Sequence, residues 1–153
     1  MARLERLPPA IREHLQAIEL PSFAPPALAA GPALEERRIA ILSTAGIHLR
    51  SDPPYLPSAV DYRVIPADVE ARDILMSHVS ANFDRTGFQQ DWNVVFPLDR
   101  LHEMAGGGEI GSVAAFHYSF MGATDPKQLE PAAKEVARLL LRDGVNGVLL
   151  VPV

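Results

Sequence analysis

The chain has 153 residues, of which 48% are hydrophobic and 22% charged, so it has the length and balance of one globular domain rather than of a disordered protein. Its net charge of −5, without a basic stripe, argues against nucleic-acid binding. It contains no cysteine, which excludes disulfides, zinc–thiolate sites and thiol nucleophiles within these residues.

The first 33 residues are predicted to form a proline-rich arm, consisting of a helix and a linker. Apolar residues recur there at spacings of three and four, as in an amphipathic helix, at Leu4, Leu7, Ile11, Leu15 and Ile18. Pro21 should end this helix, and residues 21–33 should form an irregular linker. Two interpretations of the helix stay open, because it can pack on the domain or dock on a partner subunit.

Residues 34–153 are predicted to form the main domain, in which strands alternate with helices. Short apolar or alternating runs predict five strands, at residues 38–43, 60–65, 74–76, 93–96 and 110–118. A helix should begin at Pro97, because proline is favoured at the start of a helix, and it should stop at Gly106.

The last two elements have the clearest patterns. Asp125 as N-cap, Pro126 in the first position and Gln128 in the third predict the start of a long amphipathic helix, which Gly144 ends. Residues 145–153 are almost all apolar and are expected to form a central parallel strand that is buried on both faces. The whole pattern predicts an α/β fold, a small three-layer sandwich with a mostly parallel sheet.

Two histidines and one aspartate are candidate catalytic residues. His78 and His117 follow or end predicted strands, and open parallel sheets bind ligands beyond the carboxyl ends of their strands. An imidazole there can move protons near neutral pH, whereas a histidine bonded to a backbone carbonyl would have only a structural role. Asp84, in a polar turn, could present a carboxylate to the same edge.

Arg100 and Tyr118 are candidate substrate-binding residues. Arg100 falls in the first turn of the helix after Pro97, where it can bind a carboxylate or form a surface ion pair. Tyr118 can donate a hydrogen bond to a ligand. No cofactor-binding residue is expected, because the glycine run 106–108 lacks the preceding strand of a phosphate loop. No metal site is expected either, because the histidines lie far apart without ligand spacing.

Several motifs in the second half of the chain carry a family resemblance. They are Ser77-His78, Asp84, DWNVVFPLDRL at 91–101, IGS at 110–112, HYSFMG at 117–122 and DGVNGVLLVPV at 143–153. Together they resemble the selenoprotein B family of glycine, sarcosine, betaine and D-proline reductases, and in size the chain is similar to the small selenoprotein subunit of D-proline reductase. The resemblance covers roughly residues 40–153 and leaves the arm unexplained.

The resemblance implies a reductase subunit that cleaves a carbon–nitrogen bond of an amino acid or amine. In that family a selenocysteine, or a cysteine in some members, supplies the nucleophile, and a pyruvoyl group on a larger partner subunit activates the substrate. The family pattern places the selenocysteine directly after the strand that ends here at Val153. The resemblance therefore implies either a truncated chain or a naturally short paralogue, which in both cases should be inactive alone. Its expected partners are the pyruvoyl-bearing subunit, a dithiol or thioredoxin-like reductant and the small substrate, within an oligomer.

Two other functions remain open. The chain can be a non-catalytic interaction or assembly subunit with the same fold, or an unrelated small ligand-binding module. In the reductase interpretation, His78, Asp84, His117 and Val153 should share the carboxyl edge of the sheet. Because no apolar run approaches the roughly 20 residues of a membrane span and no signal-peptide pattern is present, we expect a cytoplasmic protein without membrane contact.

Overall fold

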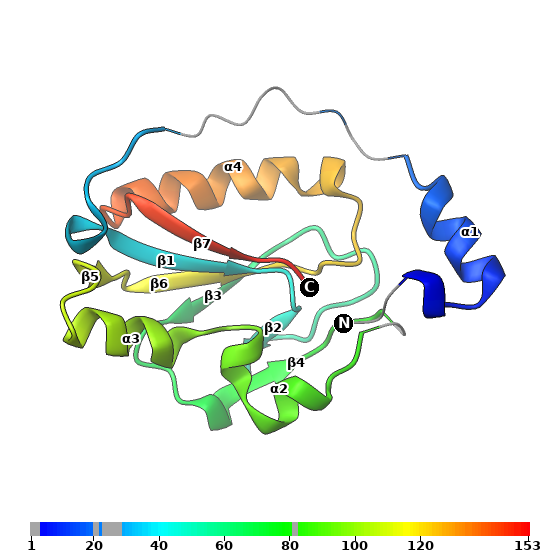
Figure 1. Cartoon of the computed structure of the whole chain (residues 1–153), viewed down its shortest axis with the longest axis horizontal. Coiled ribbons are helices and arrows are strands. Elements are labelled where there is room, and N and C mark those ends of the chain that lie inside the picture. Colours follow the sequence, from blue (N-terminus) through cyan, green and yellow to red (C-terminus); the bar gives the residue numbers. More distant parts are fainter. Residues whose placement is uncertain (1–3, 20–21, 23–28, 81–82) are drawn as a thin grey trace.

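The computed structural model describes residues 4–19, 22, 29–80 and 83–153. A five-stranded sheet lies at its centre (Figure 1), with β1 (Arg38–Ser43) between its neighbours. On one side β1 pairs in parallel with β5 (Ser112–Val113) and then with β6 (Phe116–Ser119), and on the other side with β7 (Gly147–Val151). Strand β3 (Arg63–Pro66) runs antiparallel to β6 at the far edge.

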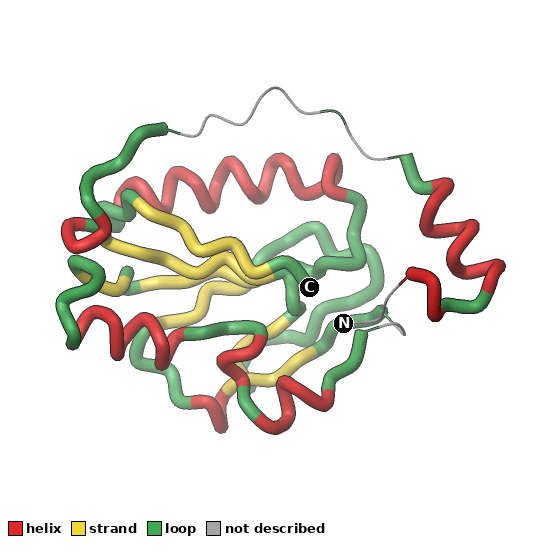
Figure 2. Tube along the Cα trace, in the orientation of Figure 1, coloured by secondary structure: helices red, strands yellow, loops and turns green. Residues whose placement is uncertain are grey.

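Helices cover both faces of this sheet (Figure 2). Helix α4 (Pro126–Arg142) covers one face with Val136 and Leu140. The other face carries α3 (Leu98–Gly106), the 3₁₀ turn η4 (Trp92–Val94), α2 (Thr86–Gln90) and a small antiparallel pair of β2 (Ile47–Leu49) and β4 (Ile74–Met76), to which the 3₁₀ turn η3 (Ala71–Asp73) leads. The predicted α/β class with a mostly parallel sheet is confirmed.

The helices of the main domain begin where their sequence signals predict. In α4 the Asp125 carboxylate accepts a hydrogen bond from the Lys127 N–H (3.0 Å), and Pro126 occupies the first turn. Helix α3 begins directly after Pro97 and runs to Gly106. Both helices thus follow from capping chemistry and apolar periodicity.

The arm contains two short helical segments instead of the single predicted helix. A 3₁₀ turn η1 (Leu4–Arg6) precedes α1 (Pro9–Ala17), and neither has a buried residue. The break falls at Pro8 and Pro9, because proline has no N–H to continue a helix from the preceding turn. The predicted linker 21–33 lies largely outside the described residues. A further 3₁₀ turn, η2 (Leu34–Glu36), leads into β1.

Two predicted strands differ from the structure. Residues 93–96 form η4 and a turn, since the Asp91 carboxylate accepts from the Asn93 N–H (2.9 Å) and so favours a turn over an extended backbone. The run 110–118 is divided into β5 and β6. Between them the Ala115 N–H donates to the Asp143 carboxylate (2.8 Å) and not to a neighbouring strand.

The prediction that the last strand is central and buried on both faces is wrong. Among the described residues β7 pairs with β1 alone, and it forms an edge of the sheet. Its side chains are partly exposed, with Val148 at 42%, Leu149 at 39% and Leu150 at 65%. An apolar run indicates a strand suited to burial, but it does not guarantee that a neighbouring strand is present.

Candidate active site at the carboxyl end of the sheet

Four chain segments meet beyond the carboxyl ends of β1, β6 and β7. Backbone hydrogen bonds join them: the Thr44 N–H donates to the Val151 carbonyl (3.1 Å), and the Gly46 N–H to the Phe120 carbonyl (2.9 Å). The Ser77 N–H in turn donates to the Gly46 carbonyl (3.0 Å). The turn after β1 therefore connects the loops that follow β4 and β6 with the end of β7.

Two glycines permit this close approach of backbones. A Cβ on Gly122 would lie 2.6 Å from the Val153 carbonyl oxygen and 2.7 Å from that of Thr44, closer than real Cβ contacts allow. Gly46 has a φ of +64°, and a Cβ there would lie 3.2 Å from the backbone of His78. The glycine that ends HYSFMG is thus required by packing at the carboxyl end.

Val153 is fixed at this edge by Thr44. The Val153 N–H donates to Thr44 Oγ1 (2.8 Å), and Thr44 Oγ1 is 3.3 Å from the Val153 carbonyl oxygen, to which it donates. The Val153 side chain packs against the core beneath α3. As expected from the sequence, Val153 and His78 lie at the same edge, linked through the turn at Thr44–Gly46. The expectation that His117 shares this edge is wrong, because its ring is bonded to the Ile41 N–H within the sheet.

His78 is buried at this edge and keeps one ring nitrogen unpaired. Its Nδ1 accepts a hydrogen bond from the Ser80 N–H (3.2 Å), and its ring lies 5.0 Å from that of Phe83. Its Nε2 has no hydrogen-bond partner among the described residues. The Arg85 guanidinium donates to the His78 backbone carbonyl, which brings a positive charge beside the ring.

The hydrogen bonds determine the state of the His78 ring. Burial, and then the Arg85 cation, lower its pKa below the ordinary value of 6.5, so the imidazole is neutral at pH 7. Because Nδ1 accepts a hydrogen bond, the single ring proton is on Nε2. His78 therefore offers a buried N–H donor with no acceptor among the described residues.

His117 has the same hydrogen-bonding pattern deeper in the sheet. It is fully buried in β6, with its ring 5.6 Å from Phe96, and its Nδ1 accepts from the Ile41 N–H of β1 (2.9 Å). Ile41 lies opposite the break between β5 and β6, so the imidazole takes the place of a missing strand partner. Burial is the main reason that the pKa of His117 is lowered to about 4.

The structure separates the other candidate residues. Asp84 lies in the His78 loop, where its carboxylate accepts from the Thr86 N–H (2.9 Å), and hydrogen bonds from Thr86 lower its pKa. Tyr118 is buried on the α4 face, edge-on to Tyr62 at 5.8 Å. Arg100 is exposed on α3 and forms an ion pair with Glu103 (2.7 Å). Only Asp84 thus shares the loop of His78, and its role as a catalytic residue stays a prediction.

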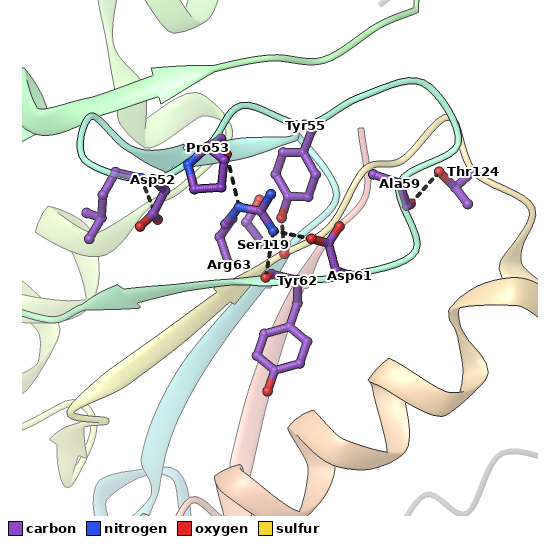
Figure 3. A network of polar contacts seen from close by, with 10 residues as sticks. Asp52, Pro53, Tyr55, Ala59, Asp61, Tyr62, Arg63, Ser119 and Thr124 are labelled. Carbon is purple, nitrogen blue, oxygen red and sulfur yellow. Dashed lines mark hydrogen bonds and ion pairs between the residues drawn. The ribbon is translucent and has the colours of Figure 1, made fainter.

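A loop covers the end of β6 (Figure 3). The Tyr55 hydroxyl donates to the Ser119 carbonyl (2.5 Å), and burial raises the pKa of that phenol. Arg63 lies over the Tyr55 ring at 4.5 Å and pairs with Asp61 at 2.6 Å, while the Thr124 hydroxyl donates to the Ala59 carbonyl (2.9 Å). This cover excludes water from the part of the carboxyl end next to β3.

The motif at 91–101, one of those that carry the resemblance, packs on the face of the sheet opposite α4. Sequence reasoning did not predict this role. The Trp92 indole N–H and the Asn93 amide both donate to the Asp99 carboxylate, each at 2.8 Å. The Val95 carbonyl accepts from the Ser43 hydroxyl at the end of β1 (2.8 Å), and Phe96 packs on His117. The available signal was Asp99 in the first turn of the helix. A carboxylate at that position can also accept hydrogen bonds from the residues that precede the helix.

Neither the surface depressions nor the metal-ligating side chains of the described residues indicate a second candidate site. Two open depressions are lined by residues such as Phe88, Trp92 and Asp99, and by Leu49, Val69 and Asp73. Neither contains a buried unpaired polar group. Within the described ranges no group of three or more histidines and carboxylates could hold a metal ion. In the same ranges no helix is long and apolar enough to cross a bilayer.

Comparison with known proteins identifies one family. Residues 13–153 match the family model described as glycine/sarcosine/betaine reductase selenoprotein B. No solved structure shows a significant match to the chain.

Curated relatives are subunits of reductases. D-proline reductase subunit gamma of Acetoanaerobium sticklandii is 33% identical over 120 residues, which are 76% of this chain and 49% of that protein. Betaine reductase complex component B subunit beta of Peptoclostridium acidaminophilum is 33% identical over 122 residues, 76% of this chain and 28% of that protein. The chain thus spans about half the length, or less, of these relatives, so the expected similarity in size to the D-proline reductase subunit is wrong.

Proposed function

The chain belongs to the glycine/sarcosine/betaine reductase selenoprotein B family, and we propose that it serves in a reductase that cleaves a carbon–nitrogen bond of an amino acid or amine. Its relatives are named as reductase subunits or complex components, which supports a role within an assembly. The partners we propose are a pyruvoyl-bearing subunit and a dithiol reductant.

The observation that carries this proposal is the unpaired Nε2–H of His78 at the edge where Val153 is fixed. Glycine, sarcosine, betaine and D-proline all carry a carboxylate on the carbon that holds the nitrogen. A neutral imidazole is a hydrogen-bond donor and a poor acid, so His78 suits binding of this carboxylate better than protonation of the leaving amine. The nearby Arg85 guanidinium adds a favourable positive charge.

The chain supplies position, and the reactive groups come from outside the 153 residues. A selenolate or thiolate would attack the carbon as the carbon–nitrogen bond breaks, with the pyruvoyl group activating the substrate and a dithiol providing the two electrons. No cysteine is present in the chain to do this. The residues around His78 would hold the carboxylate in position for this attack. His117, Asp84, Arg100 and Tyr118 stay predictions as direct participants.

The test joins the chain to the missing groups. The chain is extended after Val153 by a cysteine with the downstream family segment, and it is co-expressed with a pyruvoyl-bearing subunit. Dithiol-dependent cleavage is then measured with glycine, sarcosine, betaine and D-proline, as released amine or as the ring-opened product. We expect turnover of at least one substrate, and a KM raised about tenfold or more by His78→Gln with a smaller change in kcat.

A histidine elsewhere provides the matched control. His102 is exposed on α3, with its Nε2 3.0 Å from the Ala67 carbonyl, and His102→Gln should leave KM unchanged. If the assembled complex cleaves none of the four substrates, the proposal fails, and the alternative of a non-catalytic assembly subunit is favoured. Equal effects of the two substitutions on KM would remove His78 from the site while leaving the reductase role intact.

A further inference from the structure

Strand β7 has the composition of a central strand but lies at an edge. Its residues Gly147–Val151 carry no charge, no proline and no bulge, and all five pair in register with β1. Natural edge strands are usually protected by lysines, prolines, bulges or a covering segment, because an open edge invites pairing with other chains. Among the described residues nothing of that kind lies on the outer side of β7.

The backbone groups on that outer side can be identified. The Val151 carbonyl accepts from the Thr44 N–H, so Val151 directs its polar groups toward β1. Because these groups alternate along a strand, Leu149 and Gly147 also face β1, whereas Val148 and Leu150 direct their N–H and carbonyl groups outward. Pro152 has no N–H, so this open row ends at Leu150.

The side chains of β7 are incompletely covered on both faces. Val148 and Leu150 lie on the α4 face, opposite Ala40 and Leu42, and are 42% and 65% exposed. Leu149 lies on the opposite face and is 39% exposed. A partner that only stacked on one face would leave the other side exposed, whereas an added strand with its helices would cover both and pair the open backbone.

We propose that the outer edge of β7 binds a parallel β-strand from the part of the reductase polypeptide that corresponds to the unmatched half of D-proline reductase subunit gamma. The length of that relative carries the choice of occupant, because the segment matching this chain makes up 49% of it. The remaining half of that relative needs a packing surface, and β7 is an apolar, uncharged edge that is open in the sheet of this chain.

The opposite edge supports this choice by its contrast. Strand β3 also ends the sheet, but it contains Arg63 and Pro66, and its Arg63 is bonded to the covering loop through the Pro53 carbonyl (3.2 Å). That edge is closed within the chain itself, as expected for a permanent edge. Of the two edges compared, the one at β7 is therefore the edge at which the sheet can be extended.

The test uses the unmatched portion of the Acetoanaerobium sticklandii subunit as a separate, tagged polypeptide co-expressed with this chain. We expect a 1:1 complex in which amide exchange at Val148 and Leu150, followed by NMR, is at least about tenfold slower than in the chain alone. The amides of Leu149 and Val151, already bonded to β1, should be protected in both samples.

Two variants and a control make the result specific. Leu150→Pro removes an outward N–H and keeps the hydrogen bonds to β1, and Leu150→Lys adds a charge without changing the backbone. Both should weaken the complex at least about tenfold, whereas Leu56→Lys, at a 69% exposed apolar residue of another loop, should not. Complex formation and amide exchange are measured without enzymatic activity, so this test is independent of the proposed reaction.

Three outcomes would overturn the proposal. One is the absence of a complex. Another is a complex in which Val148 and Leu150 exchange as fast as in the free chain. The third is a concentration-dependent dimer of this chain alone that protects the same two amides, since it would assign the edge to a second copy.

Discussion

His117 and His78 show how one chemical pattern can have different meanings in two regions of the molecule. Both rings are buried, both accept a backbone N–H at Nδ1, and both leave Nε2 without a partner among the described residues. His117 completes the hydrogen bonding of a strand within the sheet, under Phe96. His78 belongs to a loop at the carboxyl edge, next to a guanidinium and close to the turn that fixes Val153.

An unpaired ring nitrogen indicates a binding site only when its surroundings also suit a ligand. The Nε2 of His117 lies in a sheet whose core residues fill the space around it. The Nε2 of His78 lies in a loop at the carboxyl edge of the sheet, and loops carry most binding groups. The pair therefore separates a histidine needed for folding from one suited to binding.

Replacing each histidine by alanine is the strongest test of this difference between the two rings. His117→Ala should lower the free energy of unfolding by about 4 kcal/mol, because it leaves a cavity beneath Phe96 and an unpaired Ile41 N–H. His78→Ala should cost about 1–2 kcal/mol. Urea unfolding followed by circular dichroism measures both. A larger loss for His78→Ala would reverse the roles assigned to the two histidines.

Acid should destabilise the protein mainly through His117. Its pKa is about 4 in the folded chain, against an ordinary 6.5, so below pH 6.5 the unfolded chain binds a proton that the folded chain does not. Stability is then complete above pH 6.5 and falls by about 3 kcal/mol as the pH drops to 4. His78, whose pKa is also lowered, acts in the same direction.

The pH effect is isolated by comparing variants. Unfolding free energies between pH 7 and pH 4.5 should fall less steeply in His117→Asn than in the wild type. His14→Asn, in the exposed helix α1, should follow the wild type. If the free energy of unfolding has the same pH dependence in all three proteins, His117 is not the source of the acid destabilisation.

The support of the His78 loop can be weakened without touching the ring. Gly46→Ala places a Cβ 3.2 Å from the His78 backbone at a positive φ, which should cost about 2 kcal/mol and shift the NMR signals of the His78 ring. The control is Gly106→Ala at the end of α3, where no atom lies within 4 Å of the new Cβ. That change should be neutral or slightly stabilising. Equal losses in both variants would argue against a tight approach at Gly46.

The smallest effect should come from the charge beside His78. Arg85→Met removes the cation and the hydrogen bond to the His78 carbonyl, so the pKa of His78 should rise toward its ordinary value with a stability loss of about 1 kcal/mol. An NMR titration of the ring measures the shift, and the pKa of His117 should stay where it is. A fall in the His78 pKa would contradict the electrostatic account.

Local patterns predicted the fold class but not the edges of the sheet. The α/β class and the helices at 98–106 and 126–142 follow from periodicity, prolines and caps, which are properties of neighbouring residues. The position of β7 depends on whether another strand is present, and no pattern within 147–151 contains that information. The predicted strand at 93–96 was wrong for a different, local reason, because the Asp91 carboxylate stabilises a turn there.

The shared edge of His78 and Val153 was predicted from the sequence, but the role of His117 was not. His78 and Val153 do lie at one edge, but the rule for carboxyl ends accounts for Val153 alone, because β4, which leads to His78, belongs to the antiparallel pair and not to the parallel sheet. The role of His117 depends on the break between β5 and β6, which Asp143 maintains from 28 residues further along the chain by binding the Ala115 N–H. Such a contact between distant residues has no signature in the local sequence.

Trp92 gives the protein a built-in optical reporter. It is the one tryptophan among the 153 residues, so excitation at the indole band selects a single position. Its indole donates to Asp99, and its ring lies 5.8 Å from Phe96, which in turn contacts the His117 ring edge-on. Fluorescence from the unmodified chain therefore reports on the corner under the sheet, and its wavelength and quenching can follow acidification or partner binding in real time without any label.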